Sequence, residues 1–385
     1  MTLARRTAAC QGALGICMLF AGLAASPVFA ADSYESEKHA FTVETVVRGL
    51  DHPWSLAFLP DGAMLVTERS GALRLISGGK LLDDPVTGTP EVAASGQGGL
   101  LDVVLDPNFA DNNLIYLSFS EPGDDDTAGT AVLRAKLVRD GGAARLTNRT
   151  VIFRMGRKTG TAHHFGSRLV FAPDGMLYVT VGERGDGERA QDPFDHAGSV
   201  IRIRSDGSVP DDNPFADGRK GLKEIWSTGH RNPQGATLNT ATGEVWTVEH
   251  GARGGDEINI PRSGKNYGWP VISYGRHYSG AKIGVGTKKT GMEQPVHYWD
   301  PSIAPSGLAF YDGAAFPKWK GNLFVGALKF RMLVRLELDG DKVVGEERLI
   351  ENRYGRIRDV RVGPKGAIWL LTDQRNGLLL KLSPK

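Results

Sequence analysis

Six segments of the chain share one pattern: an apolar strand, a turn rich in Pro, Asp or Gly, and a second apolar strand. In two of them the turn is the same Pro-Asp-Gly triplet, at residues 60–62 and 173–175. Alternating apolar residues on both sides of such turns predict β-hairpins. The six segments begin, about 45 to 75 residues apart, at Trp54, Leu100, Ser167, Gln234, Ser306 and Ile357.

Hairpins repeated in this way predict an all-β fold, a six-bladed β-propeller of four-stranded antiparallel blades. We expect it to form a single domain over residues 31–385. Amphipathic helical windows are lacking, which disfavours an α/β fold. A pair of β-sandwiches is the competing interpretation, but the same turn recurs at the same place in each unit. Residues 41–50 form an early strand, which we expect to complete the last blade and close the ring.

The first thirty residues have a different composition from the rest of the chain. Arg5 and Arg6 precede an apolar run to about Ala25, and residues 28–30 offer a small-residue cleavage pattern. This arrangement predicts a cleaved signal peptide, residues 1–30, and a periplasmic mature protein. An uncleaved anchor is the alternative, although the apolar run is short for a membrane span. The arginine pair also allows twin-arginine export, but the residues after it match that motif poorly.

Removal of this segment changes the chemistry that the mature chain can perform. Both cysteines, Cys10 and Cys17, lie within it, so a disulfide, a thiolate zinc site or a catalytic cysteine is excluded. Its two arginines account for the formal net charge of +2, and the remainder is close to neutral. A nucleic-acid partner is therefore not expected. No other segment is apolar enough to span a membrane.

Polar residues gather where the predicted hairpins begin or end. In a propeller these ends converge on the central axis, so their cationic side chains predict a pocket for an anionic ligand with several carboxylates. The residues concerned are Gln97, Arg231, Asn232, Lys329, Arg356 and Arg358.

Two further sites have ambiguous chemistry. The glycine-rich acidic loop at residues 251–257 offers carbonyl and carboxylate oxygens, which are calcium ligands. His163 and His164 are adjacent and precede a predicted strand. From the residues alone they are packed side chains, zinc ligands or a catalytic base.

The motifs "GQGGLLDVVLDPNF", "HHFGSRLVFAPDG", "GHRNPQG", "GDEINIPRSGKNYGWP", "APSG" and "RIRDV" resemble the soluble quinoprotein sugar dehydrogenases, in particular the periplasmic aldose sugar dehydrogenases. The resemblance covers nearly all of the chain after residue 30, in order. It implies a six-bladed propeller, in agreement with the hairpin count. It also implies the cofactor pyrroloquinoline quinone, a planar tricarboxylate that suits a cationic pocket.

The resemblance assigns roles to the pair of histidines. It implies that His164 is the general base, which takes the hydroxyl proton of the sugar as hydride leaves, and that His163 is not. Glu183 occupies the position of the acidic partner that orients this base, where the family has Asp. Arg231 is implied to lie near the quinone carbonyl at which negative charge develops.

The remaining assignments follow from the same motifs. The quinone-binding positions are Gln97, Arg231, Asn232, Tyr278, Lys329, Arg356 and Arg358, with Tyr278 the weaker match. The carbonyls of Gly251 and Ala252 correspond to ligands of a calcium ion that contacts the quinone and makes it more electrophilic. Glu257 and Tyr267 match ligands of a further calcium, for which other family ligands are not apparent.

The sequence therefore predicts a periplasmic, calcium-dependent quinoprotein that oxidises the C1 hydroxyl of an aldose to a lactone. It passes electrons to an external acceptor, a quinone or dye, and is a monomer or homodimer. The loop after Glu183 is short compared with that of the glucose-oxidising members of the family it resembles, which implies an open pocket and broad specificity. Two alternatives are a calcium-dependent propeller hydrolase such as a sugar lactonase, and a non-catalytic ligand-binding propeller.

Overall fold

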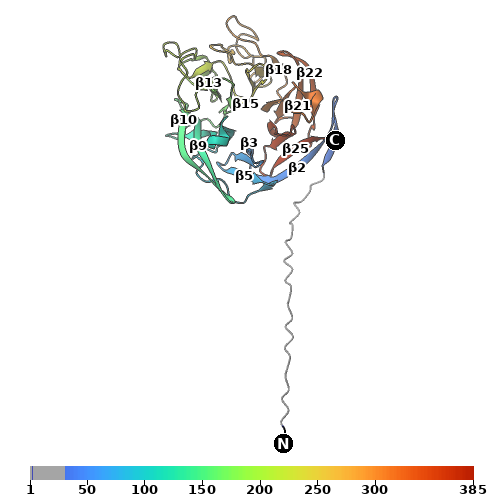
Figure 1. Ribbon diagram of the computed structural model, residues 1–385. Helices are drawn as coiled ribbons and strands as arrows, with labels where there is room; N and C mark the ends of the chain where they lie inside the picture. The colour runs from blue at the N-terminus through green and yellow to red at the C-terminus, as the bar shows by residue number, and fades with distance from the viewer. Residues whose placement is uncertain (1, 3–30) are drawn as a thin grey trace.

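The computed structural model describes Thr2 and residues 31–385. The signal peptide expected at residues 1–30 lies, apart from Thr2, outside the described residues. Six β-sheets stand around a central axis like the blades of a propeller (Figure 1). The predicted fold is thus confirmed, and β2 (Ala40–Leu50) pairs with β25 (Gly377–Pro384) to close the ring, as expected from the sequence.

Each blade is an antiparallel sheet, and in the first five blades the strands follow one another along the chain. The first blade consists of β3 (Pro53–Phe58), β4 (Met64–Glu68), β5 (Leu73–Ser77) and β6 (Lys80–Leu81). The second consists of β7 (Leu100–Leu105), β8 (Leu114–Pro122), β9 (Ala128–Asp140) and β10 (Ala143–Arg154). The third consists of β11 (Leu169–Phe171), β12 (Leu177–Val181), β13 (Ser199–Ile203) and β14 (Ile225–Ser227).

The last blade differs from the expected four strands, because β1 (Asp32–Glu35) pairs with β2 and adds a fifth strand at its outer edge. The fourth blade consists of β15 (Pro233–Leu238), β16 (Val245–Glu249), β17 (Asp256–Asn259) and β18 (His297–Trp299). The fifth consists of β19 (Pro305–Phe310), β20 (Leu323–Ala327), β21 (Met332–Asp339) and β22 (Lys342–Leu349). The sixth consists of β23 (Ile357–Val362), β24 (Ile368–Thr372), β25, β2 and β1.

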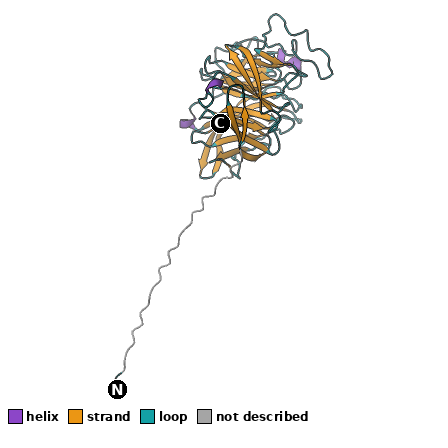
Figure 2. Cartoon of the chain, turned by 90° about the vertical axis from the view of Figure 1, so that its right-hand side faces the viewer, coloured by secondary structure: helices purple, strands orange, loops and turns teal. Residues whose placement is uncertain are grey.

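Helical structure is limited to three short turns among the described residues, so the blades carry the fold (Figure 2). These turns are α1 (Phe109–Asn112), η1 (Gly187–Gln191) and η2 (Pro317–Trp319). None of the described helices is long and apolar enough to cross a membrane.

The hairpin turns form as their sequence predicts. In the first blade the N–H of Gly62 bonds to the carbonyl of Leu59 (2.9 Å), and Asp61 accepts the N–H of Ala63 (3.1 Å). Gly62 has a φ of +85°, a left-handed conformation that glycine adopts without strain. The Pro-Asp-Gly turn at residues 173–175 repeats this geometry in the third blade.

The hydrophobic core lies between neighbouring blades rather than in one central mass. The second strands β4, β12, β16 and β20 are buried along their whole length, because a sheet on either side covers both of their faces. One cluster of buried residues joins the first and second blades, and another joins the fifth and sixth. Packing of blade against blade therefore fixes the ring.

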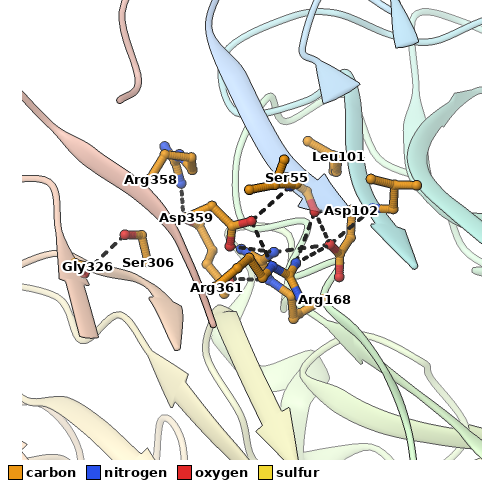
Figure 3. A network of polar contacts seen from close by, with 12 residues as sticks. Ser55, Leu101, Asp102, Arg168, Ser306, Gly326, Arg358, Asp359 and Arg361 are labelled. Atoms are coloured by element: carbon orange, nitrogen blue, oxygen red, sulfur yellow. Dashed lines mark hydrogen bonds and ion pairs between the residues drawn. The ribbon is translucent and has the colours of Figure 1, made fainter. Parts of the chain in front are cut away.

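A network of ion pairs joins the second, third and sixth blades near the axis (Figure 3). Nη1 of the fully buried Arg168 lies 3.1 Å from carboxylate oxygens of both Asp102 and Asp359. Arg361 contacts the same two carboxylates at 2.8 and 2.9 Å. The two cations and two anions thus neutralise one another in a buried site, where a charge without a partner would be strongly destabilising. Nε of Arg168 also donates to the carbonyl of Gln234 in β15 (3.1 Å), which connects the network to the fourth blade.

Candidate active site

The innermost strands β3, β7, β11, β15, β19 and β23 contact one another around the axis. A cavity of about 900 Å³ lies at the end where these strands begin. Nine of the residues predicted from the sequence line it, namely Gln97, His164, Arg231, Asn232, Gly251, Ala252, Tyr278, Lys329 and Arg356. The convergence of strand ends has therefore brought together residues that are far apart in the sequence.

His164 and Glu183 form a close pair at the wall of this cavity. Nδ1 of His164 lies 2.6 Å from Oε2 of Glu183, and the N–H of Gly185 donates to the same oxygen at 2.6 Å. The N–H of His164 itself donates to Oε1 of Gln97 (2.9 Å). The imidazole is thus fixed through both its ring and its backbone, and its Nε2 is left for a ligand.

Burial and charge act in opposite directions on this pair. Burial lowers the pKa of His164 below its ordinary value, although the hydrogen bond that its ring donates to Glu183 acts in the opposite direction. Burial also acts to raise the pKa of Glu183, but the hydrogen bond and charge of His164 outweigh it and the pKa is lowered. At neutral pH the pair is therefore a neutral imidazole beside a carboxylate, which is a competent proton acceptor.

His163 is held in a different place from its neighbour. The two rings meet edge to face, with centroids 4.6 Å apart. The side chain of His163 lines an adjoining cavity of about 460 Å³ and is absent from the lining of the larger one. Its carbonyl accepts a hydrogen bond from Arg184, a buried cation stacked 3.5 Å from the ring of Phe165. Of the two histidines, only His164 lines the larger cavity.

Arg231 is positioned by the loop that precedes β15. Its N–H donates to Oε2 of Glu249 (2.6 Å), and its Nη1 donates to the carbonyl of Gly251 (2.6 Å). The guanidinium lies 5.1 Å from the ring of Trp269. Its buried Nε has no hydrogen-bond partner among the described residues. Asn232 accepts the N–H of Gly166 (3.1 Å), so it supports the turn that carries His164.

The other predicted cations are not equivalent. Lys329 lines the cavity, and it forms no ion pair within the described part of the chain. Arg356 also lines it, and burial lowers the pKa of Arg356. Arg358 lies deeper, beside an adjoining cavity of about 440 Å³, where it bonds to Asp373 (2.6 Å) and to Gln234 (2.8 Å). Arg358 therefore has its own carboxylate partner, and its contact with the quinone stays a prediction.

The residues predicted to bind calcium occupy two places. Gly251 and Ala252 line the large cavity, whereas Glu257 and Tyr267 line a small cavity next to Glu249. Burial and the neighbouring Glu249 carboxylate raise the pKa of Glu257 to about 8. The hydroxyl of Tyr267 donates to a backbone carbonyl. Over the described residues, no group of three or more His, Cys, Asp or Glu side chains is arranged to hold a metal, so calcium stays a prediction.

Two residues of the site, Gln234 and His250, were not predicted from the sequence. Gln234 joins Gln97, His250 and Arg358 by side-chain hydrogen bonds of 3.4, 3.2 and 2.8 Å. His250 lines the cavity, and burial together with the charge of Arg231 holds its pKa well below the ordinary value. Their positions, two residues after Asn232 and directly before Gly251, are the only signal that marks them.

Comparisons with known proteins agree with one another. Residues 50–381 match the model of the glucose/sorbosone dehydrogenase family. The aldose sugar dehydrogenase YliI of Escherichia coli (strain K12) is 49% identical over 346 residues, covering 89% of this chain and 93% of the relative.

Solved structures give the same answer. The apo form of the soluble aldose sugar dehydrogenase from Escherichia coli has a TM-score of 0.87 at 48% identity, covering 90% of this chain and 100% of that one. The PQQ-bound form of the aldose sugar dehydrogenase from Streptomyces coelicolor has a TM-score of 0.73 at 28% identity, covering 89% and 98%.

Proposed function

The chain belongs to the glucose/sorbosone dehydrogenase family, and from this membership and the geometry of the site we propose that it is a periplasmic aldose dehydrogenase that uses pyrroloquinoline quinone and calcium. It oxidises the C1 hydroxyl of an aldose to the lactone. Its close relative is an aldose sugar dehydrogenase, which makes this chain an oxidoreductase acting on sugars. The observation that carries the proposal is the His164–Glu183 pair at the wall of a cation-lined cavity.

The chemistry of the cavity fits a tricarboxylate. Lys329 and Arg231 form no ion pair with a described carboxylate, and the Nε of Arg231 is buried without a partner. A buried polar atom such as Nε of Arg231 is costly unless a ligand satisfies it, whereas Lys329 is exposed and free to pair with an anion. Arg231, Asn232, Gln97, Lys329 and Arg356 would hold the quinone, with the carbonyls of Gly251 and Ala252 directed to calcium. When bound, the quinone supplies a two-electron hydride acceptor.

His164 performs the proton transfer in this proposal. Because Glu183 accepts the Nδ1–H, the neutral tautomer carries its lone pair on Nε2, toward the cavity. There it accepts the proton of the C1 hydroxyl, and Glu183 stabilises the imidazolium that forms. Arg231 places positive charge where negative charge develops. Tyr278 is 75% exposed at the mouth, which supports an open site and broad sugar specificity.

The structure offers little to the alternative hydrolase. A calcium-dependent lactonase needs free carboxylates at the axis. The axial carboxylates Asp102 and Asp359 are instead engaged by Arg168 and Arg361, and the large cavity is lined by one carboxylate, Asp300. A binding propeller, in turn, has no need for a fixed base such as His164.

The reconstitution of purified apoprotein with the quinone and calcium tests the proposal. We expect reduction of a dye such as phenazine methosulfate with a panel of aldoses, and none when the quinone is left out. Lactone hydrolysis without quinone would favour the lactonase. Tight quinone binding with no sugar oxidation would favour the binding propeller.

Substitution of Glu183 by Gln tests the pair. We expect kcat to fall about tenfold, less than on loss of the base itself, because the imidazolium loses its charged partner. Glu183 raises the pKa of His164, so its loss lowers that pKa further. Since the neutral base is the active form, the acid limb of the kcat profile should move to lower pH. An unmoved or alkaline-shifted limb would contradict the pairing.

A further inference from the structure

The mouth of the cavity carries opposite charges on its two sides. Over the fourth to sixth blades lie five exposed cations, here called the cationic rim, which are Arg253, Arg276, Lys282, Arg331 and Arg353, with the exposed carboxylates Asp300 and Glu351 among them. Over the second and third blades lie exposed carboxylates, which are Asp124, Asp125, Asp126, Asp186 and Glu188. The chain after residue 30 is close to neutral, so this separation is local and not a consequence of an overall basic composition.

The cationic rim surrounds the cavity on three blades. Arg253 and Arg276 line the cavity, and their backbones are paired by hydrogen bonds of 2.9 and 3.2 Å, which places two like charges side by side. Lys282 is joined to Arg276 by a backbone bridge. Arg331 lies in the β20–β21 turn and Arg353 precedes β23, next to residues of the cavity.

The rim cations lack a carboxylate partner in the described part of the chain, although Nζ of Lys282 donates to the carbonyl of Val285 (2.9 Å). The cavity itself is lined by five cations and one carboxylate, Asp300, if its histidines are counted as neutral, a net charge of +4. A bound tricarboxylate neutralises three of these charges and a calcium ion adds two. The loaded mouth therefore remains positive, and unpaired cations at this density attract an anionic partner.

The same surface has the anatomy of a protein interface. The segment from Arg276 to Met292 contains four Lys or Arg and no carboxylate, and it extends beyond the ring of blades near β18 (Figure 1). Within it Tyr278 and Val285 are 75% and 61% exposed, two of the few large hydrophobic side chains that face solvent in the described chain. Exposed apolar residues framed by arginine and lysine are typical of docking sites, and three blades span far more than a small substrate.

We propose that the cationic rim docks an acidic one-electron carrier protein, which accepts the electrons of sugar oxidation. This inference rests on the proposed function. Oxidation of one aldose to its lactone releases two electrons and two protons. Two molecules of the oxidised carrier each take one electron from the reduced cofactor, and the two protons pass to water. Docking over the fourth to sixth blades brings the carrier to the mouth of the cavity that holds the cofactor.

The test compares two redox proteins of opposite charge, an acidic plastocyanin and a lysine-rich cytochrome c, with phenazine methosulfate as a small acceptor. We expect kcat/KM for plastocyanin to fall about tenfold or more as ionic strength rises from about 0.01 to 0.3 M, because salt screens the attraction between the rim cations and the acidic carrier. The dye rate should change little. Plastocyanin binding to immobilised apoprotein should weaken over the same range, which provides a readout independent of turnover.

A charge-reversal variant localises the effect. Lys282→Glu/Arg353→Glu should lower kcat/KM for plastocyanin about tenfold at low salt, with the dye rate kept. The matched control is Lys318→Glu/Lys320→Glu, which makes the same change in net charge. These lysines lie on and after η2, which follows the end of β19 remote from the cavity. The control should retain the plastocyanin rate.

Three results would overturn the inference. Equal losses in both double variants would mean that only net charge matters. Faster reduction of cytochrome c than of plastocyanin would place docking on the carboxylates. A raised KM for a uronic acid but not for glucose, with plastocyanin unaffected, would assign the rim to an anionic substrate. Absence of any dye reduction in the wild type would instead contradict the proposed function.

Discussion

Replacement of His164 by alanine is expected to lower kcat for aldose oxidation about a hundredfold or more, with quinone affinity largely kept. Nε2 of His164 is the proton acceptor in the proposed reaction, and no other neutral imidazole beside a carboxylate lines the large cavity within the described chain. Without this base the hydroxyl proton has to pass to water. If the proton stays on the oxygen, hydride transfer leaves a positively charged carbonyl on the sugar, which is unfavourable. The measurement is steady-state dye reduction at saturating quinone and calcium.

His163→Ala is the matched control for this prediction. The substituted residue is the same, adjacent in the sequence, and its ring packs against that of His164. Because His163 lines the neighbouring cavity, its removal should affect KM more than kcat and cost far less than the loss of His164. A larger loss of kcat in His163→Ala would mean that the base is assigned to the wrong histidine. If neither variant loses activity, this base does not carry the reaction.

The fold was predictable because its signals are local. Each Pro-Asp-Gly turn is determined by residues within the turn, and burial of both faces selects the continuous apolar runs of β4 and β16. Ring closure by residues 41–50 was predictable because this strand precedes the first hairpin and has no partner near it in the sequence. The addition of β1 did not, since Asp32–Glu35 is a short polar segment that gains its place only by pairing with β2.

The site was predictable to the extent that it lies at strand ends. Gln97, His164, Arg231 and Arg356 precede innermost strands, so the topology brings them together. Gln234 was missed because its side chain acts through three hydrogen bonds to partners distant in the sequence, which no spacing reveals.

Charge partners are equally hidden in a sequence. Arg358 was predicted to contact the quinone on the same basis as Arg356, two residues earlier. Residues two apart in a strand share a face, so spacing does not distinguish Arg358 from Arg356, and only the structure shows that Asp373 pairs most closely with Arg358. Arg358→Ala should therefore lower the free energy of unfolding by about 2 kcal/mol, since it removes the closest partner of the buried Asp373 carboxylate, which keeps its contact with His52 at 3.0 Å.

The double variant Lys329→Ala/Arg356→Ala is expected to lower quinone affinity about a hundredfold. Both side chains line the cavity, and each is partly exposed, so a charge-assisted contact of about 1.5 kcal/mol is appropriate for each. Neither substitution leaves a buried carboxylate without a partner, because Asp373 keeps its closer contact with Arg358 (2.6 Å against 3.7 Å). The variant should therefore fold with an unchanged Tm, which separates binding from stability.

Titration of apoprotein with the quinone at saturating calcium measures this affinity directly. Lys318→Ala/Lys320→Ala removes two positive charges from the opposite end of the blades and serves as the control. If the control loses as much affinity as the double variant, long-range attraction of a trianion would explain the loss. If the double variant binds the quinone as tightly as the wild type, the cations at the mouth do not hold the cofactor. In that case the cavity would owe its affinity to Arg231 and the carbonyls of Gly251 and Ala252, and the cationic rim together with Lys329 and Arg356 would be free to act on the carrier alone.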